Sequence, residues 1–299
     1  MKIAITGANS SVGINLIKHI VSVTENQVIA GVRSELAMQS LPHSAQVEPR
    51  LISYQDPRQL AETLTGAECI VHLAGILIEG KNTSYASANV DATEAVVKAA
   101  QILNTKHLVF ISVVGASTDS GNAYFRSKAL AEEFVRKSGL PASIIRTPIL
   151  LGPNTAGASS IIGAAKQTKT KILGGGKYSM RPLDIDDLNQ AILNCCDSES
   201  VDAKLYELVG PEPISYRDLI QQTALMMNNR VEIGSVPVGL AKLVAAISSR
   251  IKGGGITPTV IDVITKDEVV AENADGALKI TLTPLQDTLK KILEHKKNK

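Results

Sequence analysis

The sequence lacks tryptophan and holds only three phenylalanines and six tyrosines among 299 residues. An aromatic platform that stacks on sugars is therefore not expected. No apolar run reaches the roughly 18 residues that a membrane-spanning helix needs, and the chain starts directly with a strand-like pattern. We therefore expect neither a transmembrane segment nor a signal peptide.

Cysteine is scarce, and charge of one sign is not in excess. Cys69, Cys195 and Cys196 show neither metal-ligand nor disulfide-framework spacing, so we expect core packing, no metal site and a reducing cytoplasmic location.

The chain has 31 Lys and Arg against 29 Asp and Glu, a net charge of +2. Because no large basic cluster appears, nucleic acid is not an expected partner.

Short apolar runs alternate with helical patterns through the first half of the chain. This alternation predicts an α/β fold in which a doubly wound parallel sheet is covered on both faces by helices. We expect strands at residues 2–6, 28–32, 50–54, 69–74, 108–112 and 142–146, and helices at 14–21, 59–64, 88–103 and 124–137. After Pro148 the alternation loosens. We therefore predict a nucleotide-binding domain over 1–151 and a smaller, mainly helical substrate region over 152–299, parts of which return to the sheet.

A glycine-containing turn joins the first strand to the first helix. Gly7 can adopt backbone angles closed to other residues, and Gly13 lets the helix pack closely on the strand. The free N–H groups at the start of the helix would then face the pyrophosphate of a dinucleotide. The pattern predicts a Rossmann-type sheet, although Ser10 replaces the middle glycine of the full motif.

The residues after the second and third strands bear on the cofactor. An NAD-binding protein would carry an acid after the second strand, whereas this chain has Arg33 and Ser34 there. Both could hold a 2′-phosphate, so NADP(H) is favoured over NAD(H), with a solvated loop arginine as the alternative. Asp56 either accepts from the adenine amino group or caps the helix that starts at Pro57.

Tyr124 and Lys128 are four residues apart in a predicted helix, so they share one face. A neighbouring ammonium lowers the pKa of a tyrosine. Such a tyrosine can exchange a proton with a hydroxyl or carbonyl while hydride moves to or from nicotinamide. The pair follows a strand that ends at Ser112, which makes the pattern more specific.

The motifs together resemble the short-chain dehydrogenase/reductase superfamily, in particular its extended and atypical branches. The resemblance rests on segments spread over nearly the whole chain: 6–8 with Gly13, Asp56, 72–75, 89–91, Ser112, Tyr124 with Lys128, 146–148, 152–153, 181–188, 206–211 and 214–219. The segments 256–258 and 282–285 are most similar to a narrower group, often labelled NAD-dependent epimerase/dehydratase. That group contains the nucleotide-binding accessory subunit of respiratory complex I and its bacterial relatives.

The resemblance implies a role for each matching residue. Tyr124 would be the general acid/base, Lys128 would bind the nicotinamide ribose, and Ser112 would help to hold the geometry. The residues predicted to contact the pyrophosphate are Gly7, Ala8, Asn9, Ser10, Ser11, Val12 and Gly13. At the adenosine end we expect contacts from Arg33, Ser34 and Asp56, with Leu73, Ala74 and Gly75 under the ribose. Thr147 and Pro148 would lie beside the nicotinamide.

The leading hypothesis is an NADP(H)-dependent oxidoreductase that acts on a carbonyl or hydroxyl carbon of a small molecule. Val113 follows Ser112 where many active members have a second hydroxyl residue, which puts the proton relay in doubt. Two alternatives stay open: a nucleotide-sugar epimerase or dehydratase, and a non-catalytic nucleotide-holding structural or assembly protein of the respiratory-complex or quinone type.

Residues 238–251 are apolar over much of their predicted helical surface. Intramolecular packing is the simplest interpretation. A lid over the substrate, a homodimer face, and a peripheral membrane or protein contact are the alternatives. His72 is expected to be a core residue.

Overall fold

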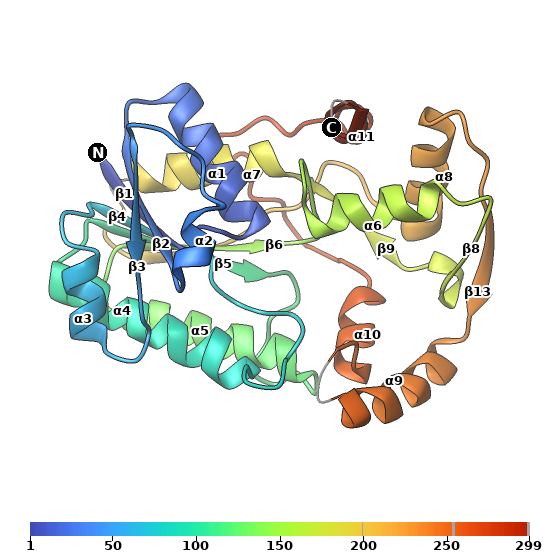
Figure 1. Cartoon of the computed structure of the whole chain (residues 1–299), viewed down its shortest axis with the longest axis horizontal. Helices are drawn as coiled ribbons and strands as arrows, with labels where there is room; N and C mark the ends of the chain where they lie inside the picture. Colours follow the sequence, from blue (N-terminus) through green and yellow to red (C-terminus); the bar gives the residue numbers. More distant parts are fainter. Residues whose placement is uncertain (199, 253–254, 298–299) are drawn as a thin grey trace.

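Seven parallel strands form the main sheet of the computed structural model, which describes residues 1–198, 200–252 and 255–297 (Figure 1). The strands are β1 (Lys2–Thr6), β2 (Gln27–Val32), β3 (Val47–Leu51), β4 (Cys69–His72), β5 (His107–Val113), β6 (Ala142–Thr147) and β11 (Ala203–Glu207). Their order is β11-β6-β5-β4-β1-β2-β3. The order reverses between β1 and β4, and sheets of this kind bind ligands at that point, beyond the carboxyl ends of the strands.

Helices cover both faces of this sheet (Figure 1). Ile3 and Ile5 of β1 face a core shared with α1 (Ser11–Val23) and α7 (Ile185–Cys196). Ala4 faces the opposite core, which includes α3 (Pro57–Thr63), α4 (Ala92–Leu103) and α5 (Ala123–Lys137). Successive strand residues point to opposite faces, so both faces need apolar side chains. The predicted doubly wound fold is confirmed.

Several predicted elements have different bounds, and three of them bear on the site. β3 covers Val47–Leu51 instead of 50–54. It contains Pro49, which an edge strand tolerates because one side of its backbone needs no partner. β4 ends at His72, so residues 73–74 leave the sheet. The helix predicted over 88–103 begins with a π-helical turn, η1 (Ala86–Asp91), and continues as α4.

The second half of the chain forms a smaller lobe and also returns to the sheet. Its helices are α6 (Ala156–Ala165), α8 (Tyr216–Met226), α9 (Val238–Lys252), α10 (Pro258–Ile264) and α11 (Leu285–Lys297). Short strands pair within it: β7 (Leu150–Leu151) with β10 (Leu183–Asp184), β8 (Lys169–Leu173) with β13 (Glu232–Val236), and β9 (Ser179–Met180) with β12 (Ile214–Ser215). β11 extends the main sheet beside β6, and α7 packs against α1. The division at residue 151 stays a prediction.

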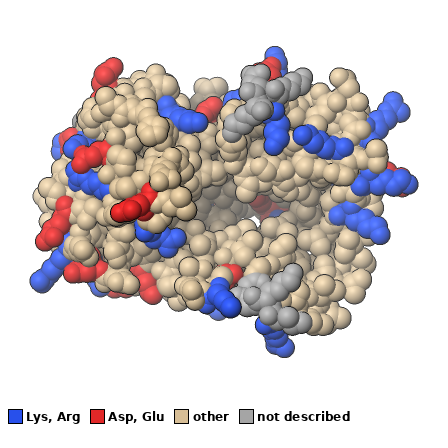
Figure 2. All heavy atoms as spheres, viewed as in Figure 1, with Lys and Arg blue, Asp and Glu red and all other residues tan. Residues whose placement is uncertain are grey.

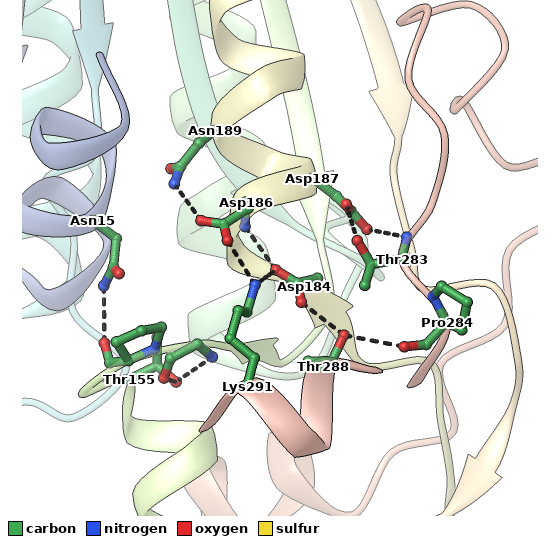
Figure 3. Close-up of polar contacts among 12 residues, drawn as sticks. Asn15, Thr155, Asp184, Asp186, Asp187, Asn189, Thr283, Pro284, Thr288 and Lys291 are labelled. Carbon is green, nitrogen blue, oxygen red and sulfur yellow. Dashed lines mark hydrogen bonds and ion pairs between the residues drawn. The ribbon is translucent and has the colours of Figure 1, made fainter. Parts of the chain in front are cut away.

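Acidic residues at the start of α7 fasten α11 and the segment before it (Figure 3). Lys291 forms ion pairs with Asp184 and Asp186, the latter at 2.7 Å between Nζ and Oδ2. The Thr288 hydroxyl donates to Asp184 at 2.7 Å, and the Thr283 hydroxyl donates to Asp187 at the same distance. These bonds join the late segment of the chain to the helix that covers the sheet.

The three cysteines are free and buried, as predicted. Cys69 lies in β4 next to Cys196 at the end of α7. Burial raises the pKa of Cys195 to about 12, so its thiol stays protonated at neutral pH. These side chains serve packing between the sheet and α7.

Candidate functional site

A cleft of about 610 Å³ opens at the carboxyl ends of β1, β2 and β4. Its walls come from the turn after β1, the ends of β2 and β3, the segment after β4, and the π-helical turn with the start of α4. The lining residues are Gly7, Asn9, Ser10, Gly31, Val32, Arg33, Ile52, Ser53, Tyr54, Gln55, Leu73, Ala74, Gly75, Ile76, Asn82, Thr83, Ser87, Ala88 and Ala92. The cleft therefore lies where the strand order reverses.

The turn after β1 allows no larger residue at either glycine. Gly7 has a φ of +78°, and a Cβ there would lie 2.9 Å from the Ala74 backbone nitrogen. A Cβ at Gly13 would lie 2.5 Å from the carbonyl oxygen of Ala8. Ser10, in place of the middle glycine, caps α1 by accepting a hydrogen bond from the Gly13 N–H at 3.0 Å. The positive end of α1 thus points to the cleft.

Most of the turn residues predicted to contact the pyrophosphate stand at or near the cleft wall. Gly7, Asn9 and Ser10 line it, and Ala8 is buried beneath. Ser11, Val12 and Gly13 form the first turn of α1. Their contacts with a cofactor stay predictions.

Arg33 supplies the charge at the end of β2. Among the described lining residues it is the single charged side chain, and no Asp or Glu accompanies it. Ser34 lies outside the lining and caps the short helix α2 (Glu35–Met38), accepting from the Ala37 N–H at 3.2 Å. Of the two predicted phosphate ligands, the structure brings Arg33 to the cleft.

Asp56 caps α3, which is one of the two roles left open for it. Its carboxylate accepts from the Arg58 N–H at 2.8 Å, and the residue lies outside the cleft lining. Ser53, Tyr54 and Gln55 line that wall instead. These residues were not predicted to line the cleft, because a strand was expected through residue 54, whereas β3 ends at Leu51. The adenine contact of Asp56 stays a prediction.

His72 forms the buried floor below the segment that lines the cleft. Its Nδ1 lies 2.6 Å from the Thr6 hydroxyl and its Nε2 lies 3.0 Å from the Thr93 hydroxyl, while its ring stacks on Phe110. Burial lowers the pKa of His72 to about 3, so the ring is neutral at physiological pH. The expected core role is confirmed, and Leu73, Ala74 and Gly75 line the cleft above it.

Asn89 in the π-helical turn fixes the segment after β4. Its Oδ1 accepts from the Ile76 N–H at 2.7 Å, and its Nδ2 donates to the Ser127 hydroxyl of α5 at 3.0 Å. Turns of this kind are frequent at functional sites. The asparagine therefore joins the cleft wall to the helix that carries the predicted catalytic pair.

Lys128 reaches from α5 to the edge of the cleft. A Cβ added at Gly75 would lie 3.7 Å from its Nζ. The ammonium donates to the Ile111 carbonyl at 2.9 Å and lies 4.3 Å from the centre of the Phe110 ring. Burial lowers the pKa of Lys128 to about 8, against the opposing charge of Glu132.

Tyr124 lies one turn before Lys128, in the first turn of α5. Its ring packs against Tyr85 with 5.8 Å between ring centres. Burial raises the pKa of Tyr124 above its ordinary value, and Tyr85 adds to the shift. This direction is opposite to the one expected from Lys128, because desolvation dominates. Among the described residues no hydrogen bond joins the Tyr124 hydroxyl to Lys128 or Ser112.

Ser112 belongs to a buried ionic network. Its hydroxyl donates to Glu132 at 2.6 Å. Glu132 also accepts two hydrogen bonds from the Arg146 guanidinium, at 2.8 and 2.7 Å, and Arg146 pairs with Glu207 at 3.2 Å. The network joins β5, α5, β6 and β11. The predicted role of Ser112 in holding the geometry of the site stays a prediction.

Thr147 and Pro148 follow this network at the end of β6. The Thr147 hydroxyl donates to the Ser112 carbonyl at 3.3 Å, and neither residue lines the cleft. Their contact with a nicotinamide stays a prediction. No group of three His, Cys, Asp or Glu side chains that could hold a metal occurs in the described ranges.

Residues 7–174, more than half of the chain, match a family described as NAD(P)H-binding. The chain therefore belongs to the NAD(P)H-binding proteins with a Rossmann-type sheet. Its relatives fit the extended branch of the short-chain dehydrogenase/reductases that the motifs indicated.

The relatives differ in kind. The chain is 25% identical over 251 residues to the mitochondrial NADH dehydrogenase [ubiquinone] 1 alpha subcomplex subunit 9 of Arabidopsis thaliana, covering 80% of this chain and 62% of that protein. It is 23% identical over 225 residues to an uncharacterized sugar epimerase of Bacillus subtilis, covering 72% of this chain and 97% of that one. The chain thus spans about three fifths of the complex I subunit.

The fold also matches solved enzymes over its full length. DesIV, a dTDP-glucose 4,6-dehydratase from Streptomyces venezuelae with NAD and TYD bound, superposes with a TM-score of 0.76, covering 100% of this chain and 97% of that one. The identity of 16% is low. This likeness supports the architecture alone.

Proposed function

We propose that the protein binds NADP(H) in the cleft and transfers hydride at a carbonyl or hydroxyl carbon of a small molecule, with Tyr124 as general acid/base. The observation that carries this proposal is the position of Lys128. Its ammonium lies beside the cleft-lining Gly75 and one helical turn from Tyr124. A cation there can hold the nicotinamide ribose and favour the tyrosinate form.

The chain's own residues would hold the cofactor and move the proton. The nicotinamide, when bound, supplies or accepts the hydride. Tyr124 donates its proton to the substrate oxygen during reduction and recovers it during oxidation. Arg33 holds the 2′-phosphate at the other end of the cleft, which supports NADP(H) over NAD(H). Ser112 acts as a positioning residue through Glu132.

The substitution Tyr124→Phe tests the assignment. Removing a general acid/base is expected to lower kcat about 100-fold or more while nucleotide affinity stays unchanged. Tyr206→Phe is the matched control, because it removes the same hydroxyl in β11. Full turnover of a found substrate by Tyr124→Phe would overturn the catalytic role.

The buried Ser112 favours a second candidate, a protein that holds the nucleotide without turning it over. Its hydroxyl is committed to Glu132, and Val113 follows. Release of the bound nucleotide, followed over time, separates the candidates. Exchange within seconds supports the redox enzyme. Retention for hours supports the holding protein, or an epimerase or dehydratase that recycles its cofactor, and a screen of nucleotide sugars then distinguishes these two.

A further inference from the structure

Helix α9 turns an apolar face away from the protein. Four side chains spaced three or four residues apart are more than half exposed: Leu240 (56%), Leu243 (61%), Val244 (58%) and Ile247 (56%). Ala245, on the other side of the helix, is buried. A surface helix normally carries polar residues on its outer face. The simple expectation that residues 238–251 pack inside the molecule is therefore wrong for this face.

An apolar groove of about 480 Å³ continues this face toward α10. Its lining holds one hydroxyl and otherwise apolar side chains: Leu173, Val236, Leu240, Ala241, Val244, Ala245, Ser248, Ile256, Ile261 and Ile264. Ile256 and Ile264 are themselves exposed. We call the exposed ridge of α9 and this groove the α9–α10 surface. Contiguous apolar surfaces on soluble proteins mark contacts with partners or membranes.

The charges of α9 are all of one sign. The helix contains Lys242, Arg250 and Lys252 and no acidic residue. Lys242 pairs with Asp262 of α10, whereas Arg250 is exposed one turn after Ile247. Lys266, just after α10, is also exposed. A basic helix with an exposed apolar face has the composition of helices that lie on anionic lipid surfaces.

We propose that the α9–α10 surface binds the boundary between headgroups and acyl chains of an anionic lipid bilayer, with α9 parallel to the membrane plane. Leu243 and Ile247 enter the acyl region, and Arg250 pairs with lipid phosphate. Residues 1–198, 200–252 and 255–297 contain no helix long and apolar enough to cross a bilayer. Peripheral attachment of this kind combines apolar burial with electrostatic attraction.

The contacts of α10 argue against a lid, because they fix this region to α5. The Asn122 side chain donates to the Thr259 carbonyl at 3.0 Å, and Lys266 lies 4.4 Å from the centre of the Phe125 ring. With α10 docked, α9 lies at the rim of the molecule, at the lower right of Figure 1 and of Figure 2, which has the same view. A movement over the substrate is not needed to explain the exposed ridge.

A second copy of the chain is a less favourable occupant than a bilayer. A two-fold interface places the same patch of both copies face to face. Arg250 is exposed at the end of the ridge, and the facing α9 of a second copy holds no acidic residue that could pair with it. Anionic lipid meets this cation with complementary charge.

Co-sedimentation of the full chain with vesicles, without added nucleotide, tests the proposal. We expect binding to phosphatidylglycerol-containing vesicles that weakens as salt rises and is at least tenfold weaker with phosphatidylcholine alone. The double variant Leu243→Ser/Ile247→Ser should lose at least tenfold in binding. Val23→Ser/Ile102→Ser, which removes two equally exposed apolar side chains from α1 and α4, should bind as the unmodified protein does.

Three results would overturn the proposal. The first is failure to bind anionic vesicles, and the second is vesicle binding that the α9 double variant leaves unchanged. The third is a concentration-dependent dimer that the same variant abolishes in the absence of vesicle binding, which would identify a second copy as the occupant. Nucleotide affinity of each variant shows that the fold is intact. Because the assay needs neither nucleotide nor substrate, its outcome is independent of the proposed oxidoreductase activity.

Discussion

The two ends of the candidate site differ in how their polar groups are used. At the nucleotide end, Asn9 and Arg33 line an open cleft. At the reaction end, Lys128 donates to the Ile111 carbonyl and Ser112 donates to Glu132. The nucleotide end therefore needs no rearrangement to receive a ligand. At the reaction end the Lys128 ammonium keeps further N–H donors for a ribose, whereas Ser112 must exchange its bond to Glu132 before its hydroxyl can donate to a ligand.

This difference between the two ends allows nucleotide binding and hydride transfer to depend on different side chains. Hydrogen bonds to charged groups are worth more than neutral ones, so the bond from Ser112 to the Glu132 carboxylate opposes the release of that hydroxyl toward a ligand. A protein can thus hold the nucleotide firmly while its catalytic groups stay only partly engaged.

Breaking the buried ionic network around Glu132 should lower the stability of the protein more than any other change proposed here. Glu132→Gln removes the charge that faces Arg146 in a buried site, which typically lowers the free energy of unfolding by about 3–5 kcal/mol. Glu133→Gln changes the neighbouring residue, whose pairing with Lys137 is exposed, and should leave the denaturation midpoint nearly unchanged. Equal midpoints for the two variants would contradict the assigned importance of the network.

Gly13→Ala should abolish tight binding at the nucleotide end. Its Cβ would lie within 3 Å of the Gly7 and Ala8 carbonyl oxygens, so the turn must open. We expect a loss of about 100-fold in nucleotide affinity, or roughly 2.7 kcal/mol. Gly163→Ala in α6, where a Cβ meets nothing within 4 Å, is the matched control. Calorimetric titration of both variants measures the difference, and unchanged affinity in Gly13→Ala would remove the turn from the binding site.

Arg33→Ala should weaken binding of NADP(H) by about 10- to 150-fold, because a charged hydrogen bond contributes roughly 1.5–3 kcal/mol. Affinity for NAD(H) should not change, since that cofactor has no 2′-phosphate. Arg58→Ala, outside the cleft lining, serves as the control. Tighter binding of NAD(H) than NADP(H) by the unmodified protein would be incompatible with the role of Arg33.

The stability of the cleft floor should depend on pH through His72. Its folded pKa of about 3 lies below the ordinary value of 6.5, so the unfolded chain binds the proton first as pH falls. The contribution of neutral His72 to the free energy of unfolding is fully present above about pH 6.5 and declines toward about pH 3. Between about pH 7 and about pH 5.5 the free energy of unfolding should fall by about 1 kcal/mol. In His72→Gln this part of the pH dependence should disappear, whereas the exposed His43→Gln should keep it. Denaturant titrations across this range provide the measurement.

The periodic features of the fold could be predicted from the sequence. Apolar runs with helices between them correctly predicted the parallel sheet, because both of its faces are buried. The spacing of Tyr124 and Lys128 predicted one helix and one face. The cleft wall from Gly7 to Ser10 followed from the conformational demands of the turn.

The hydrogen-bond partners of the polar side chains could not be predicted from the sequence. Ser112 and Glu132 are 20 residues apart and meet only because α5 packs on β5. Ser53, Tyr54 and Gln55 reach the cleft because β3 ends early at the sheet edge. The pKa of Tyr124 depends on its burial, which helical spacing alone does not determine.

The position of α11 has a consequence for the order of events during synthesis. Leu289, Ile292 and Leu293 complete a core with Ile161 of α6 and Leu219 of α8, and Lys291 joins the start of α7 (Figure 3). The ribosome makes about 5–20 residues per second, so α6 waits on the order of ten seconds for its last neighbour. During that interval the nucleotide-binding sheet can already assemble up to β6, while the small lobe keeps apolar surface exposed to chaperones.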